Sequence, residues 1–228
     1  MRVLTIGFCA AIALSTACSP SSSEPQIQDE RIDLERAPII GGSVDPGDPA
    51  VGYLRARSGN IGWGSTGTLI APNVFASAGH CVEDATSQTR FDVYLGTSIA
   101  DATPGDWRSV SAFHAHPRYG TVNLSDGYDC SVLVLDQPVA GVAPKPYSRT
   151  AVDASFHGMP VRIVGYGVTN GPAQTGSGTK RQLSTFITGH YGGVITTGSR
   201  GKTTCQGDSG GPTFAMFGGV ETMVGITS

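Results

Sequence analysis

Short apolar runs separated by turn-forming residues make up the chain from about residue 39 onward. Runs rich in Val, Ile, Leu and Phe alternate with clusters of Gly, Pro, Asn and Asp, and no long segment repeats its apolar residues at helical spacing. The runs that we expect to form strands are residues 68–70, 74–76, 91–95, 132–135, 161–164 and 223–226. Short strands at such regular spacing predict an all-β sandwich or barrel.

The N-terminal end has a different pattern. Arg2 precedes an uncharged, mostly apolar stretch over residues 3–17, which is too short to span a bilayer but suits an export signal. We interpret residues 1–17 as a signal peptide and residues 18–38, which open on a Ser/Pro-rich run, as a tether and propeptide. Small residues before Cys18 favour its lipidation, and simple secretion is the alternative. Both interpretations place the chain outside the cytoplasm, secreted or in the cell envelope.

Composition and charge narrow the function classes. Lys and Arg total 15 and Asp and Glu total 18, so the net charge of −3 provides no basic excess for nucleic acid. Charged residues are 14% and hydrophobic residues 39% of the chain, which excludes a disordered protein or a coiled coil. We expect no nucleic-acid partner, and membrane contact only through a lipid on Cys18.

A serine surrounded by glycines stands near the C-terminal end. In residues 205–212, Cys-Gln-Gly-Asp-Ser-Gly-Gly-Pro, small neighbours let Ser209 sit on a tight turn where backbone N–H groups converge. A serine hydroxyl needs a base to become a nucleophile, and His80 is the candidate. Asp129, which leads straight into an apolar strand, is the candidate carboxylate that orients the imidazole. These residue types predict acyl transfer.

The chain resembles the chymotrypsin/trypsin-like serine peptidases from Ile39 to its last residue. The motifs that carry the resemblance, in the family's order, are residues 39–42 (IIGG), 77–81 (SAGHC), 129–133 (DCSVL), 165–167 (GYG) and 207–212 (GDSGGP). The resemblance implies two six-stranded antiparallel Greek-key barrels over residues 39–228. It also implies a serine endopeptidase that acts on proteins or peptides without a metal or an organic cofactor.

The resemblance assigns a chemical role to each motif residue. Ser209 attacks the scissile carbonyl, His80 accepts and returns the proton, and Asp129 stabilises the imidazolium. The backbone N–H groups of Gly207 and Ser209 form the oxyanion hole. These assignments predict a catalytic triad of Ser209, His80 and Asp129 beside an oxyanion hole.

The activation segment departs from the family. In the family, the α-amino group freed at Ile39 pairs with Asp208 and orders the site. Cleavage there usually follows a basic residue, but in this chain Pro38 precedes Ile39 and Arg36 lies two residues further back. An activating protease is expected, and its identity stays open.

One of the residues expected to bind the substrate also differs from that of the family. The resemblance assigns substrate binding to Thr203, Gln206 and Ser228. Thr203 stands at the base of the specificity pocket, where trypsin-like enzymes carry an Asp. An uncharged Thr203 disfavours basic side chains, so we expect a small or apolar residue before the scissile bond.

The cysteines and the end of the chain form a third departure. The family partner of Cys81 lies in a strand that reads Ser-Thr-Gly-Thr at residues 65–68 here. Cys81 and Cys130 each follow a residue of the expected His80–Asp129 contact, so a bridge between them is one hypothesis and free buried thiols are the other. The family continues beyond the position of Ser228 with a strand and a helix, so we expect the second barrel to be incomplete.

Two other functions remain open. One is a catalytically silent, peptidase-like binding module. Pro38 before the expected cleavage site and the end of the chain both favour this alternative. The other is an esterase that uses the same three residues. The order His, Asp, Ser and the absence of an α/β pattern disfavour the esterase.

Overall fold

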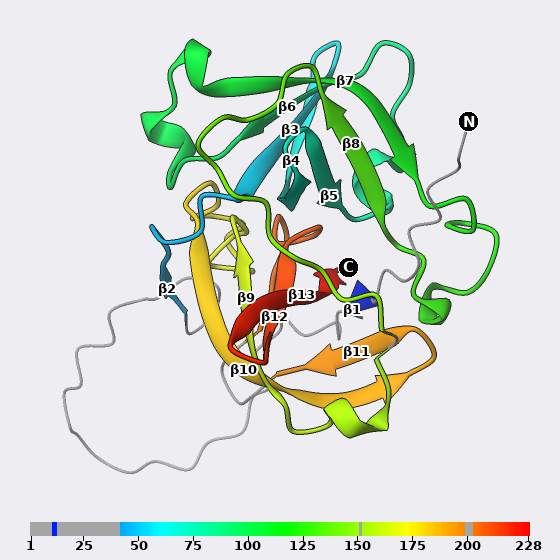
Figure 1. Ribbon diagram of the computed structural model, residues 1–228. Helices are drawn as coiled ribbons and strands as arrows, with labels where there is room; N and C mark the ends of the chain where they lie inside the picture. The colour runs from blue at the N-terminus through cyan, green and yellow to red at the C-terminus, as the bar shows by residue number, and fades with distance from the viewer. Residues whose placement is uncertain (1–10, 13–41, 151, 199–202) are drawn as a thin grey trace.

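A closed six-stranded barrel forms the first half of the molecule. The computed structural model describes residues 11–12, 42–150, 152–198 and 203–228. The barrel strands are β3 (Val51–Ser58), β4 (Ile61–Ala71), β5 (Val74–Ser77), β6 (Arg90–Tyr94), β7 (Trp107–Ala115) and β8 (Ser131–Leu135). Their hydrogen-bonded order is β3-β4-β5-β8-β7-β6, and they form the upper half of the view in Figure 1. The expected all-β fold is confirmed.

Strand β3 shows why this sequence builds a barrel wall. Leu54 and Ala56 are buried, and they alternate with Arg55 and Arg57. Both guanidinium groups reach Asp92 on β6, at 3.1 Å from Arg55 and 2.7 Å from Arg57. An alternation of this kind directs one face of a strand to the core and the other away from it.

A second sheet forms the other half. Its strands are β1 (Ala11–Ile12), β2 (Ser43–Val44), β9 (Pro160–Gly165), β10 (Arg181–Tyr191), β11 (Val194–Thr197), β12 (Pro212–Phe217) and β13 (Val220–Thr227). The order is β11-β1-β13-β12-β9-β10-β2, and β11 also pairs with β10. Strand β1 runs parallel to both β11 and β13. The predicted incompleteness of the second barrel stays a prediction.

Helical segments are short. They comprise α1 (His80–Glu83) and the 3-10 turns η1 (Ile99–Asp101), η2 (Pro104–Asp106), η3 (Leu124–Asp126) and η4 (Ala154–Phe156). Among the described residues, no helix is long and apolar enough to cross a membrane.

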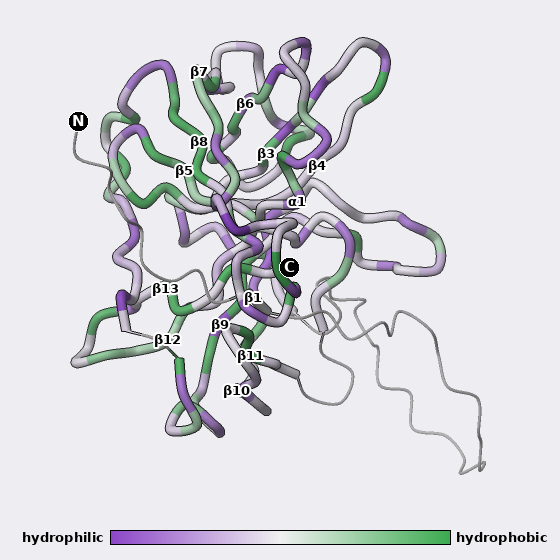
Figure 2. Tube along the Cα trace, turned by 90° about the vertical axis from the view of Figure 1, so that its right-hand side faces the viewer, coloured by the Kyte–Doolittle hydropathy of each residue, from purple (hydrophilic) through white to green (hydrophobic). Residues whose placement is uncertain are grey.

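One apolar core spans both halves. It includes Phe75 and Leu133 from the barrel and Tyr166, Phe214 and Ile226 from the second half, all of them 3% exposed or less. Figure 2 shows apolar stretches along strands such as β5, β8 and β9 and polar stretches in several of the loops. A shared core fixes the two halves against each other, which is what a site at their junction requires.

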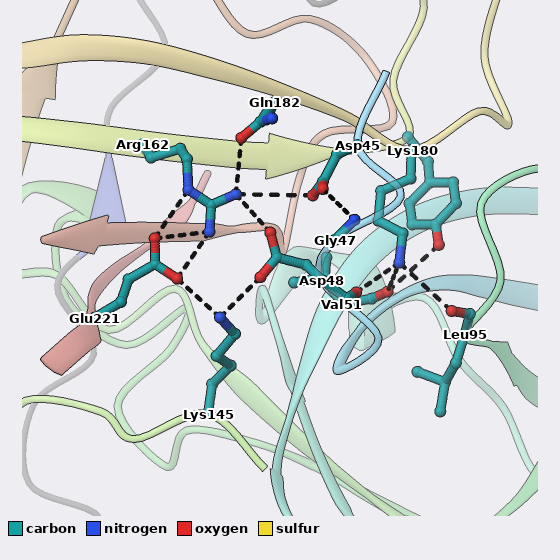
Figure 3. Close-up of polar contacts among 11 residues, drawn as sticks. Asp45, Gly47, Asp48, Val51, Leu95, Lys145, Arg162, Lys180, Gln182 and Glu221 are labelled. Carbon is teal, nitrogen blue, oxygen red and sulfur yellow. Dashed lines mark hydrogen bonds and ion pairs between the residues drawn. The ribbon is translucent and has the colours of Figure 1, made fainter. Parts of the chain in front are cut away.

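A charged network ties the segment before β3 to the second sheet (Figure 3). Arg162 on β9 donates to Asp48 and makes bonds of 2.7 Å to both carboxylate oxygens of Glu221 on β13. Lys145 lies 2.8 Å from each of the same two carboxylates. The side chain of Asp48 is only 4% exposed, so it relies on these cations.

Lys180 forms the second part of this network. It is 1% exposed, and its Nζ donates to the backbone oxygens of Asp48 at 2.6 Å, Val51 at 3.0 Å and Leu95 at 3.4 Å. Burial lowers the pKa of Lys180 to about 8, against the opposing charges of Asp45 and Asp48. The lysine therefore joins the first barrel to the strand that begins at residue 181.

Candidate active site

His80 and Asp129 form a direct pair at the junction. Strand β5 ends at Ser77, and helix α1 begins at His80. His80 Nδ1 lies 2.7 Å from Asp129 Oδ2, and the backbone N–H of His80 donates to Asp129 Oδ1 at 2.8 Å. The side chain of Asp129 is 1% exposed and that of His80 is 36% exposed. The carboxylate is thus enclosed, while the imidazole reaches the surface.

The pair shifts the pKa values of both groups. Burial favours the neutral form of each, but the hydrogen bond and the opposite charge outweigh it. They raise the pKa of His80 above its ordinary 6.5 and lower the pKa of Asp129 below its ordinary 3.8. Ser228 further lowers the pKa of Asp129, because its Oγ donates to Asp129 Oδ2 at 2.5 Å. The arrangement stabilises an imidazolium at His80.

Ser209 lies on a tight turn between Cys205 and β12. The N–H of Asp208 donates to Cys205 O at 3.0 Å, and the N–H of Gly211 donates to Asp208 O at 2.8 Å. Gly207 and Gly210 have φ values of +93° and +84°, which glycine adopts without strain. The motif glycines are therefore required by the conformation of this turn.

Backbone contacts bring the turn of Ser209 to the His80 side of the junction. The N–H of Gly210 donates to Thr227 O at 2.7 Å, one residue before Ser228. A Cβ on Gly210 would lie 2.1 Å from Ser77 Oγ and 3.0 Å from Ala78 N. The turn therefore packs directly against the end of β5, just before His80.

Asp208 lies under the turn and is fully buried. Its carboxylate accepts hydrogen bonds from the N–H groups of Gly167 at 2.8 Å and Cys205 at 2.9 Å. A Cβ on Gly165 or Gly167 would overlap this carboxylate, which explains the Gly-Tyr-Gly run. Burial raises the pKa of Asp208 to about 6, against those two hydrogen bonds. Ile39, its predicted partner, lies outside the described residues.

Comparison with known proteins decides the family. The family model described as Trypsin matches residues 39–228. The chain belongs to the trypsin family. The predicted resemblance is confirmed, and membership supports a serine endopeptidase at the level of the family.

Relatives within the trypsin family come from animals and from a bacterium. Chymotrypsin-like elastase family member 1 of Bos taurus is 28% identical over 218 residues, which covers 84% of this chain and 79% of the relative. A trypsin-like protease of Streptomyces glaucescens is 27% identical over 234 residues, which covers 96% of this chain and 80% of the relative. Trypsin 5G1 of Aedes aegypti is 28% identical over 178 residues, which covers 71% of this chain and 64% of the relative.

The residues predicted for substrate binding lie in different surroundings. Gln206 is exposed next to the turn, and Thr203 is half-buried with its Oγ1 donating to Thr204 O at 3.3 Å. Ser228, by contrast, contacts Asp129. Its serine hydroxyl therefore supports the buried carboxylate, a contact that the sequence did not predict.

The cysteine prediction needs a correction. Of the two hypotheses, the Cys81–Cys130 bridge is wrong, because Cys81 carries a free, buried thiol. Cys81 follows His80 in helix α1, where successive side chains diverge by about 100°. Contact between His80 and Asp129 therefore does not bring the next pair of side chains together. Cys18, the predicted lipidation site, lies outside the described residues.

The structure has a cavity beside Asp129 that the sequence did not predict. Its volume is about 250 Å³, and its lining consists of Arg118, Tyr119, Gly120, Val122, Asn123, Leu124, Tyr128 and Asp129. The guanidinium of Arg118 lies 4.2 Å from the centre of the Tyr128 ring. Within the described ranges, no group of three His, Cys, Asp or Glu residues could hold a metal ion. The charged groups of the cavity lining are Arg118 and Asp129, and no motif in the sequence marks the cavity.

Proposed function

We propose that this chain is a serine endopeptidase in which Ser209, His80 and Asp129 form the catalytic triad. The observation that carries the proposal is the 2.7 Å contact between His80 Nδ1 and a buried Asp129 carboxylate. The turn of Ser209 packs against the strand that ends just before His80, which supports the third member. Membership of the trypsin family supports the same reaction.

The proposed reaction has two halves that pass through an acyl-enzyme. Ser209 Oγ attacks the peptide carbonyl carbon while His80 Nε2 accepts the hydroxyl proton. The oxyanion accepts hydrogen bonds from the backbone N–H groups of Gly207 and Ser209. The C–N bond then breaks as His80 donates the proton to the leaving amine. Water then attacks the ester carbonyl as His80 accepts its proton. The bond between the carbonyl carbon and Ser209 Oγ breaks as His80 returns the proton to Oγ, which releases the acid and restores the Ser209 hydroxyl.

The proposed role of Asp129 follows from its surroundings. It holds the Nδ1 proton of His80, so that Nε2 faces the substrate as an acceptor. The imidazolium that forms during attack then lies next to a carboxylate of lowered pKa. Ser228 keeps one carboxylate oxygen in place by its hydrogen bond.

Activation and export complete the proposal. Residues 1–17 direct export, residues 18–38 are a tether and propeptide, and residues 39–228 are the peptidase domain. Cleavage before Ile39 by another protease would free an amine for Asp208, whose buried carboxylate has two backbone donors and a raised pKa. A lipid on Cys18 is the proposed membrane anchor, with simple secretion as the alternative.

The proposed substrate has a small or apolar residue before the scissile bond. Thr203 offers a hydroxyl rather than a charge at the pocket base. The relatives carry both elastase and trypsin names, so their names do not decide this preference. A silent peptidase-like module is the second candidate, because Pro38 replaces the usual basic residue before Ile39.

Turnover of peptide and ester substrates tests the function. The exported protein, with its N-terminus read by Edman degradation, is assayed beside Ser209→Ala and the exposed-site control Ser87→Ala. We expect the wild type and the control to cleave peptide amides, and Ser209→Ala to lose at least about 10³-fold in kcat. Ester turnover without amide turnover would favour the esterase. Neither activity, with a new N-terminus at Ile39, would favour the silent module.

A further inference from the structure

Thr66 is a buried polar residue of β4 that contacts the nucleophile turn across the junction. None of its surface is exposed. Its Oγ1 donates to Gly207 O at 2.7 Å and accepts a hydrogen bond from the N–H of Tyr166 at 3.0 Å. Its backbone N–H donates to Ser209 O at 2.8 Å. One residue of the first barrel thus holds the carbonyl groups at both ends of the segment Gly207-Asp208-Ser209.

Gly207 is the part of this segment that most needs an external contact. Its φ of +93° lies in a region that glycine leaves easily, and it has no side chain to anchor it. The two backbone hydrogen bonds within the turn are made by the N–H groups of Asp208 and Gly211. The carbonyl of Gly207 is instead held by the Thr66 hydroxyl. That bond fixes the orientation of the peptide that follows Gly207.

We propose that the hydroxyl of Thr66 is a positioning group for the oxyanion hole, an inference that rests on the proposed function of Ser209. By holding the carbonyls of Gly207 and Ser209, Thr66 fixes the peptides that follow these two residues, and this restricts rotation of the backbone that carries their N–H groups. Oxyanion stabilisation depends on donors that are oriented before the reaction begins. Thr66 acts through Gly207 and does not touch the substrate.

Two substitutions separate the hydroxyl from the rest of the side chain. Thr66→Val keeps the shape, the β-branching and the backbone N–H that binds Ser209 O, but it removes the bonds to Gly207 and Tyr166. Thr66→Ser keeps the hydroxyl and removes one methyl group. The pair therefore compares hydrogen bonding with packing at the same position.

Steady-state kinetics and a tetrahedral inhibitor give the decisive readout. For Thr66→Val we expect kcat to fall about tenfold to a hundredfold, less than for loss of a whole oxyanion donor, with KM within about twofold of wild type. A peptidyl aldehyde, which adds to the serine as a tetrahedral adduct, should lose affinity by the same factor. Thr66→Ser should stay within about threefold of wild type in both measurements. If Thr66 had a purely structural role, the loss of inhibitor affinity would not match the loss of kcat.

Hydrogen exchange supplies a measurement that does not need activity. Residues 203–211 of Thr66→Val should exchange faster than those of wild type, while Thr66→Ser should match wild type. Equal exchange in all three proteins would overturn the proposal, and so would equal kinetic losses in Val and Ser. A wild type that exchanges as expected but has no turnover would count against Ser209 catalysis and leave the contact of Thr66 supported.

Discussion

Replacing Asp48 with asparagine removes one negative charge from the network of Figure 3 while keeping the size of the side chain. Asp48 contacts Arg162 Nη1 and, at 2.8 Å, Lys145 Nζ. Its side chain is 4% exposed, whereas both cations are 22% exposed. After the substitution, both cations keep the carboxylate of Glu221, and Arg162 also keeps Asp45 at 3.7 Å.

The size of the effect follows from this partial burial. Breaking a fully buried ion pair costs about 3–5 kcal/mol, and an exposed pair contributes about 0–1 kcal/mol. Since the cations are partly exposed and keep Glu221, we expect Asp48→Asn to lower the free energy of unfolding by about 2–3 kcal/mol. Glu221→Gln, at a side chain that is 25% exposed, should cost about 1 kcal/mol.

The same network predicts a pH dependence of stability. Burial favours the neutral carboxyl, but Arg162 and Lys145 lower the pKa of Asp48 well below its ordinary 3.8. A carboxylate with a lowered folded-state pKa stabilises the protein fully above its unfolded-state pKa, and this contribution is lost as pH falls through the folded-state pKa. The difference between wild type and Asp48→Asn should therefore be constant near neutrality and shrink below about pH 4.

Urea unfolding followed by tryptophan fluorescence measures these free energies at several pH values. Asp136→Asn, at an exposed carboxylate, is the control and should stay within about 0.5 kcal/mol of wild type. A change of less than about 0.5 kcal/mol for Asp48→Asn at pH 7 would refute the claim that this network anchors the segment before β3.

Three further predictions concern the site. Gly210→Ala would place a Cβ 2.1 Å from the Ser77 hydroxyl oxygen at a φ of +84°, and in urea unfolding it should lower the free energy of unfolding by about 2–4 kcal/mol. The control Gly218→Ala also has a positive φ but has open space around it, and it should cost about 1 kcal/mol. Because only neutral His80 accepts a proton and Asp129 raises its pKa, kcat/KM should fall as pH drops through a value above 6.5; a midpoint below 6.5 would contradict the pairing. Amide substrates with small or apolar residues before the scissile bond should be cleaved faster than those with Lys or Arg, and Thr203→Asp should reverse the order; an unchanged order would count against Thr203 as the pocket base.

Strands could be predicted from the sequence where several apolar residues follow one another directly. The runs at residues 74–76, 132–135 and 161–164 lie inside β5, β8 and β9. Strand β7 was missed because its residues are half-buried or exposed and none is fully buried, and β10 was missed because its buried residues alternate with exposed ones. In β10, buried Thr185 stands between Leu183 and Ile187, so a threonine interrupts the apolar alternation.

The site was predictable where a motif carries the geometry. The structure brings the imidazole of His80 against the Asp129 carboxylate, and its turn packing supports the position of Ser209. The contact of Ser228 with Asp129 spans 99 positions in the chain, and that of Thr66 with Gly207 spans 141. A lone serine or threonine in a strand carries no local signal of such a partner, because the contact exists only once the two halves pack. The charged network was missed for the same reason.

Covalent capture of the nucleophile shows whether His80 and Asp129 activate the hydroxyl of Ser209. The exported protein is treated with a fluorophosphonate probe, the intact mass is measured, and the modified peptide is sequenced by tandem mass spectrometry. We expect one adduct per chain, located on Ser209, absent in Ser209→Ala and formed roughly 10⁴-fold more slowly in Asp129→Asn. A folded chain with an N-terminus at Ile39 that forms no adduct, or that carries it on another residue, would rule out Ser209 as the nucleophile.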